Sequence, residues 1–130
     1  QMREVEAELS AASGDAFLSL RNNLAAGIDA VEQAVSYILA TYGKDIKAAS
    51  VGSVPFLKLL GIVAGGWQMA RAALIAQKKL DGGDGEASFY QAKIITARFY
   101  ADHVLAQAPG LANTVVNGAE GALALPEDQF

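Results

Sequence analysis

Apolar residues recur every three or four positions from residue 15 to residue 42, and this spacing constrains the fold more than any other feature. The stripe consists of Phe17, Leu20, Leu24, Ile28, Val31, Val35, Ile38 and Tyr42. Polar residues fall between these positions, so the pattern predicts an amphipathic helix with one buried face. We expect Asp15 to cap its first turn and Gly43 to end it in a left-handed conformation.

The rest of the chain shows similar periodicity in shorter segments, each of which predicts a helix. A glycine-rich turn is expected at 81–85, and the tail after residue 123 is expected to be irregular. Pro55 must either start or kink the third helix, because proline lacks a backbone N–H. The expected helices cover residues 2–12, 45 or 48 to 80, 86–106 and 109–119.

The third helix carries apolar residues around most of its circumference up to Trp67. We therefore expect this half to be the most buried part of the domain, with Trp67 in the core. Gly61, Gly65 and Gly66 each cost roughly 1 kcal/mol of helix stability against alanine. That cost predicts that another helix approaches closely at these glycines.

These segments predict an all-α fold, an antiparallel up-and-down bundle of three long and two short helices. The 130 residues suit one ordinary domain. Within it, residues 1–13 are either a leading helix or the remnant of a tag, and residues 14–130 form the helical domain proper. The longest apolar run, from Leu59 to Trp67, is shorter than the about 20 residues that a membrane span needs. We expect a soluble protein with no membrane span.

Composition excludes several kinds of function. The chain has no cysteine, which rules out disulfides and thiolate metal sites. Its net charge of −4 is a poor fit to the phosphate backbone of a nucleic acid. With 52% hydrophobic and 18% charged residues, the chain is too apolar to stay disordered.

His103, the only histidine, is the first candidate for chemistry. Beside Asp102 it could serve as a general base, but sequence neighbours on a helix point in different directions. No second histidine and no cysteine completes a metal site. We favour a structural or surface role, and we expect no catalytic, cofactor-binding or metal-binding residue in this chain.

The loop Gly82-Gly83-Asp84-Gly85 precedes a predicted helix, as phosphate-binding loops do. It lacks both the Gly-Lys-Ser/Thr ending of those loops and a preceding strand. Its acidic residues would also repel phosphate. We interpret it as an ordinary turn between helices.

Two arginines, Arg71 and Arg98, lie in otherwise apolar helices and could reach an acidic ligand. We favour a structural role for both: a salt bridge, or a guanidinium that is hydrogen-bonded to a helix end or stacked on an aromatic ring such as Trp67. The aromatic residues of this half are expected to belong to the core rather than to a cofactor cage. They are Trp67, Phe89, Phe99 and Tyr100.

Three stretches of the second half, with the ending Leu-Pro-Glu-Asp-Gln-Phe, carry a family resemblance. They are Pro55-Phe56-Leu57-Lys58-Leu59-Leu60-Gly61 leading into Gly65-Gly66-Trp67, then Phe89-Tyr90-Gln91-Ala92-Lys93, then Ala97-Arg98-Phe99-Tyr100-Ala101-Asp102-His103. In combination they resemble the C-terminal helical extension of long bacterial acyl-CoA dehydrogenases. The resemblance covers about Asp15 to Phe130.

The resemblance implies that residues 14–130 are the non-catalytic C-terminal helical domain of an FAD-dependent enzyme. Such enzymes oxidise acyl-CoA to 2-enoyl-CoA in fatty acid metabolism and pass the electrons to an electron-transferring flavoprotein. The family's catalytic glutamate and most of its flavin contacts lie upstream, so no cofactor is expected in this chain. The implied partners are the upstream dehydrogenase body and a second copy in a homodimer, and the implied location is the cytoplasm.

Two other functions stay open, a freestanding helical dimerisation module and a small-ligand-binding bundle whose interior accepts an acyl chain. For the favoured function, the domain would support subunit packing or shape the substrate cavity. It should then expose an apolar patch where the dehydrogenase body packs. We expect that patch on the leading segment and on the stripe of helix 15–42.

Overall fold

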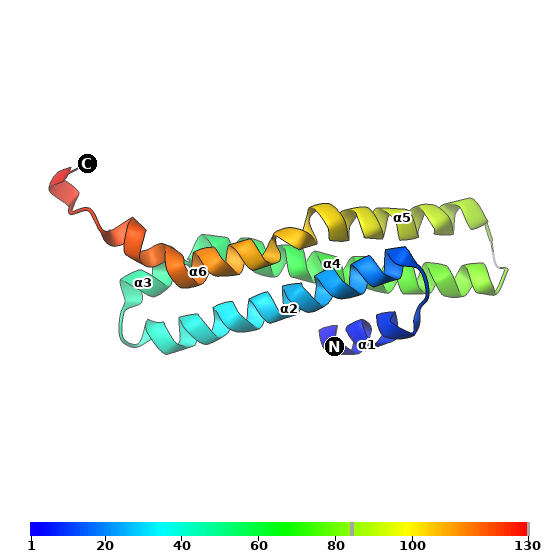
Figure 1. Cartoon of the computed structure of the whole chain (residues 1–130), viewed down its shortest axis with the longest axis horizontal. Coiled ribbons are helices and arrows are strands. Elements are labelled where there is room, and N and C mark those ends of the chain that lie inside the picture. Colours follow the sequence, from blue (N-terminus) through cyan, green and yellow to red (C-terminus); the bar gives the residue numbers. More distant parts are fainter. Residues whose placement is uncertain (84, 130) are drawn as a thin grey trace.

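The protein is an elongated bundle of α-helices, as the computed structural model shows (Figure 1). The structure describes residues 1–83 and 85–129; Asp84, part of the expected turn, and Phe130 lie outside the described residues. Helices account for every regular element in these ranges, which confirms the all-α antiparallel bundle. The elements are α1 (Met2–Ala11), α2 (Asp15–Tyr42), α3 (Ile46–Val51), α4 (Ser53–Asp81), α5 (Ala87–His103), η1 (Leu105–Gln107), α6 (Ala108–Leu123) and η2 (Glu127–Gln129).

Two long helices, α2 and α4, run antiparallel along the whole bundle, and the other helices pack on them (Figure 1). α5 and α6 follow one another along the pair, joined by the single turn η1, and both contact α2 and α4. α1 packs on α2 and α4 in the half that contains α5, whereas α3 packs on α2 and α6 at the opposite end. The two halves of α2 and α4 therefore have different neighbours.

The sequence predicted the bounds of α2 correctly but not the way the helix begins and ends. Gly14, with φ of 109°, turns the chain between α1 and α2, because glycine adopts this conformation without strain. Asp15 is the first helical residue and its side chain makes no capping hydrogen bond, so the predicted cap is wrong. Gly43 is right-handed, with φ of −77°, so the predicted left-handed ending is wrong as well.

The segment expected to begin the third helix forms a separate helix, α3, six residues long. Asp45 caps it by accepting a hydrogen bond from the backbone N–H of Ala48 at 3.0 Å. Gly52 ends α3 and begins α4. Pro55 falls in the first turn of α4, where its missing N–H costs nothing. The alternative that Pro55 starts the main helix, rather than kinking it, is confirmed.

The core lies between α2, α4 and the consecutive pair α5–α6. Small residues allow the close packing, because many of the buried positions are alanines that let backbones approach. The largest fully buried side chains are Leu9, Leu20, Leu24, Leu59, Val63, Leu105 and Val115. The predicted close approach is confirmed at two of the three glycines: a Cβ on Gly65 would collide with Tyr100, and one on Gly66 would collide with Leu105. At Gly61 nothing lies within 4 Å.

The first half of α4 is not the most buried part of the domain, contrary to the sequence-based expectation. Val54 is 75% exposed and Leu57 is 72% exposed, because α1 covers only the other half of the helix. By length and composition alone, α4 would also suffice to cross a membrane, with mean hydropathy 1.4 in its most apolar window. A core helix of a soluble protein meets the same criterion. Its Leu59 and Val63 are fully buried against the bundle.

Candidate interaction surface

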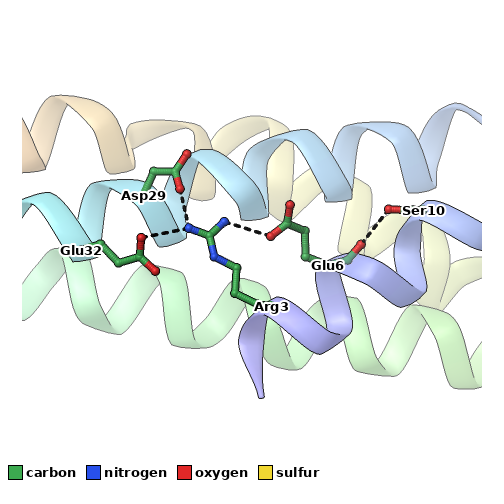
Figure 2. A network of polar contacts seen from close by, with 5 residues as sticks. All are labelled: Arg3, Glu6, Ser10, Asp29 and Glu32. Carbon is green, nitrogen blue, oxygen red and sulfur yellow. Dashed lines mark hydrogen bonds and ion pairs between the residues drawn. The ribbon is translucent and has the colours of Figure 1, made fainter.

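Arg3 links the leading helix α1 to α2 through hydrogen bonds and ion pairs. Its guanidinium donates hydrogen bonds to Glu32 at 3.0 Å and to Asp29, both on α2, and to Glu6 of its own helix at 3.0 Å (Figure 2). The hydrogen bond to Asp29, followed by that to Glu6, holds the pKa of Arg3 above its usual range. Beneath these polar contacts, Val5 and Leu9 of α1 are buried in the bundle core. The leading helix is thus integrated into the bundle.

His103 and Asp102 make their closest contacts with different partners. The His103 ring stacks on Phe99 at 4.3 Å between ring centroids. Asp102 accepts hydrogen bonds from the Ser19 hydroxyl of α2 and from Arg98 Nε at 3.4 Å. The Ser19 hydroxyl, followed by Arg98, lowers the pKa of Asp102. The arrangement joins α5 to α2, so the structural role favoured for these residues fits their contacts.

Both arginines singled out in the sequence make structural contacts. Arg71 lies over the Trp67 ring, 5.6 Å from its centroid, and also donates to Gln68 at 3.1 Å. Arg98 forms an ion pair with Asp102 one turn away. Trp67 itself is half-buried at the edge of the core. The predicted stacking of a guanidinium on Trp67 and the predicted salt bridge are confirmed.

No constellation of reactive groups emerges from the described ranges 1–83 and 85–129. No three His, Cys, Asp or Glu side chains gather there closely enough to hold a metal ion. No polar or charged residue is buried in the same ranges. The buried side chains of these ranges are therefore apolar, and the half-buried Trp67 places its indole N–H inside without a hydrogen-bond partner.

Three large apolar side chains lie exposed on α5, among polar ones. Phe89 is 52% exposed, Ile95 is 67% exposed and Phe99 is 60% exposed. The last two are one turn apart, so they lie on the same side of the helix. We call Phe89, Ile95 and Phe99 the α5 face. Phe89 and Phe99 were predicted to lie in the core, and that prediction is wrong because α5 packs through its alanines Ala97 and Ala101 instead.

A second group of exposed apolar side chains lies at the far end of the bundle, where α2, α3 and α4 meet. Leu39 is 75% exposed, and Tyr42, Val54 and Leu57 are also exposed. Between these helices lies an apolar pocket of about 460 Å³. Its walls come from Ile38, Tyr42, Ala49, Ser50, Ser53, Phe56 and Leu57.

The expected apolar patch is therefore only partly where the sequence placed it. The stripe of α2 does end in exposed Tyr42, with exposed Leu39 beside it, but Val5 and Leu9 of α1 are buried. The α5 face was missed because apolar residues around a helix do not reveal which side its neighbours cover. Arg3 was missed as well, although its partners Asp29 and Glu32 lie one turn apart on the polar side of the predicted helix.

Comparison with known proteins gives two matches. The family described as acetyl-CoA dehydrogenase C-terminal like matches residues 1–126, a range that includes the leading helix. The chain is also similar to a 3-methylmercaptopropionyl-CoA dehydrogenase of Ruegeria pomeroyi, with 43% identity over 102 residues. The matched region covers 78% of this chain but only 17% of that relative.

Proposed function

Because this chain belongs to the acetyl-CoA dehydrogenase C-terminal-like family, as a C-terminal domain of an acyl-CoA dehydrogenase, we propose that it is a non-catalytic domain that packs on the dehydrogenase part of its chain. The observation that carries the proposal is the α5 face: three large apolar side chains lie exposed on a helix whose other side is built into the core. Exposed apolar groups of this kind mark interaction sites.

The parent enzyme, in this proposal, is a cytoplasmic, FAD-dependent acyl-CoA dehydrogenase that forms homodimers. It oxidises an acyl-CoA to the 2-enoyl-CoA and passes the electrons to an electron-transferring flavoprotein. The similarity to a 3-methylmercaptopropionyl-CoA dehydrogenase supports an acyl-CoA thioester as the substrate class. The flavin, when bound, supplies the hydride-accepting chemistry of that step.

The groove between α2, α3 and α6 does not fit FAD, and we assign the flavin to the remainder of the dehydrogenase. This groove is an open pocket of about 720 Å³. Its ionisable side chains include the carboxylates Asp45 and Glu120 and no lysine or arginine. These carboxylates would repel the pyrophosphate of a dinucleotide. We derive no catalytic step through this domain.

A dye-reduction assay tests the proposal. The full-length dehydrogenase should reduce an electron-acceptor dye in the presence of acyl-CoA, and this chain alone, supplied with FAD, should not. The double variant Ile95→Glu/Phe99→Glu in the full-length protein should lower its thermal unfolding temperature by several degrees. Leu18→Glu, at a site on α2 that is 55% exposed, is the control.

Two results would contradict the proposal. Dye reduction by the isolated chain would place catalysis in this domain. If the double variant, like the control, left the unfolding temperature unchanged, the α5 face would be open to solvent in the full enzyme.

A further inference from the structure

The seam between α2 and α4 is covered along only half of its length. Beside the second half of α4, α1 lies on this seam: Glu4 and Glu8 share a pocket with Trp67 and Arg71 of α4, and Arg3 reaches Glu32 of α2. α1 runs antiparallel to α2. Toward the end of α1, Leu9 and Ser10 lie beside Leu18 and Arg21 in the first turns of α2. At the start of α1, Arg3 contacts Asp29 and Glu32, which lie further along α2. Figure 1 shows the first residue near the middle of the bundle, with α1 pointing away from the α3 end.

The apolar surface continues past Gln1 in line with α1. On α2, Val35, Leu39 and Tyr42 follow Glu32 at steps of three and four, so they share the side that α1 covers further back. On α4, Leu60 precedes Trp67 by seven residues, and Phe56 precedes Leu60 by four, which places both in the same row. Leu39 and Leu57 are more than 70% exposed. The apolar pocket of about 460 Å³ lies where the two rows reach Tyr42 and Phe56, and α3 forms its third wall.

We propose that the residues immediately preceding Gln1 in the full-length dehydrogenase continue α1 along the α2–α4 seam and fill this pocket. The inference rests on the proposed function, in which the domain is part of a much longer chain; the match covers 17% of its relative. The direction of α1 sends that preceding chain toward Leu39, Tyr42 and Leu57. A second copy, or a distant part of the dehydrogenase, could enter the same pocket only by displacing that preceding chain.

The length required is short. From Glu32, level with Arg3, to Tyr42 is a rise of about 15 Å along α2, at about 1.5 Å per residue. About ten further helical residues, or about five in an extended conformation, would reach the pocket. If they are helical, apolar residues should recur among them at steps of three and four, continuing the pair Val5 and Leu9.

Photo-crosslinking in the full-length dehydrogenase tests the inference. A benzophenone amino acid is placed at Leu57 and, in a separate variant, at Leu39; both sites are exposed, so the bulky probe should not disturb folding. Each should cross-link mainly to a peptide within about ten residues before Gln1. The matched control is the same probe at Ile95, on the α5 face, which should not label that peptide.

Three outcomes would overturn the inference: no cross-link from Leu57 and Leu39, a cross-link to a second copy in a mixture of isotope-labelled and unlabelled protein, or a cross-link to a distant part of the dehydrogenase. The last leaves the proposed function intact, because the domain would still pack on the enzyme. Conversely, failure of the Ile95 probe to label the dehydrogenase part would count against the proposed function and not against the seam.

Discussion

Gly66 of α4 faces Leu105 so closely that a Cβ on the glycine would lie 2.7 Å from Cδ2 of the leucine. Leu105 begins the single turn η1 between α5 and α6, and it is 1% exposed. The contact fixes where the consecutive helices α5 and α6 cross α4. A larger side chain at either position would have to displace a helix, because the surrounding core is closely packed.

Gly66→Ala should therefore destabilise the domain, whereas Gly61→Ala should stabilise it. Overpacking costs about 1–3 kcal/mol, and we expect this cost to exceed the gain of about 1 kcal/mol from replacing a helical glycine. At Gly61 nothing lies within 4 Å of the added methyl group, so only the gain remains. Urea unfolding of the two variants measures both effects. If Gly66→Ala stabilised the protein, the contact between α4 and Leu105 would have room for a methyl group.

Tyr100 ties α5 to α4, since its hydroxyl donates to the carbonyl oxygen of Ile62 at 3.0 Å. Tyr100→Phe should cost about 0.5–1.5 kcal/mol near neutral pH. Burial raises the pKa of Tyr100 above its ordinary value of 10.0. A raised pKa in the folded state means that this stability is complete below pH 10.0 and is lost as the pH rises through the folded pKa.

The wild type should accordingly lose its advantage over Tyr100→Phe in alkaline solution. Denaturant unfolding of both proteins between neutral pH and pH 11 measures the difference. A difference that stays constant across this range would show that Tyr100 ionises equally well in the folded and unfolded chains.

Asp102 gives the opposite pH dependence. The Ser19 hydroxyl, with Arg98, holds the pKa of Asp102 below its ordinary value of 3.8. A lowered pKa in the folded state stabilises the protein above pH 3.8, and that stability disappears as the pH falls through the folded pKa. Ser19→Ala should raise the pKa of Asp102, as the carboxyl carbon resonance followed by NMR would report. Ser36→Ala is the control, since the Ser36 hydroxyl bonds only within α2. An unchanged pKa of Asp102 in Ser19→Ala would show that the Ser19 hydroxyl does not stabilise the Asp102 carboxylate.

Arg3 should control how firmly α1 is attached. Arg3→Gln removes the charge shared by Glu6, Asp29 and Glu32 and leaves three carboxylates near one another. Amide hydrogen exchange in α1 should rise several-fold, while exchange in α4 stays the same. Lys58→Gln, on the exposed side of α4, should change neither. Equal exchange in wild type and Arg3→Gln would mean that Val5 and Leu9 hold α1 without help from the ion pairs.

Periodicity predicted most of the fold because a stripe of large apolar residues specifies both the helix and its buried side. The bounds of α2 follow directly from this stripe. In α4 and α5 the pattern failed to separate inside from outside, since most of the buried positions are small residues such as Ala97 and Gly66, while Leu57, Ile95 and Phe99 are exposed. An apolar residue on an interaction surface looks the same in the sequence as one in the core.

The family could be predicted from three short stretches, but the interaction surfaces could not. Which side of α5 is exposed depends on where α2 and α4 lie, which is a property of the assembled bundle. The polar contacts follow the same rule: the partner of Ser19 is 83 positions away in the chain, at Asp102. Contacts of this kind join helices whose register the sequence pattern does not fix.

Hydroxyl-radical footprinting of the α5 face tests the central claim most directly. The side-chain oxidation rates of Phe89, Ile95 and Phe99 are compared between the isolated chain and the full-length dehydrogenase, with Leu18 as an internal reference on α2. Our account predicts that the three rates fall several-fold in the full-length enzyme while the rate of Leu18 is unchanged. Equal rates at Ile95 and Phe99 in the two proteins would contradict the claim that this domain packs on the dehydrogenase through α5.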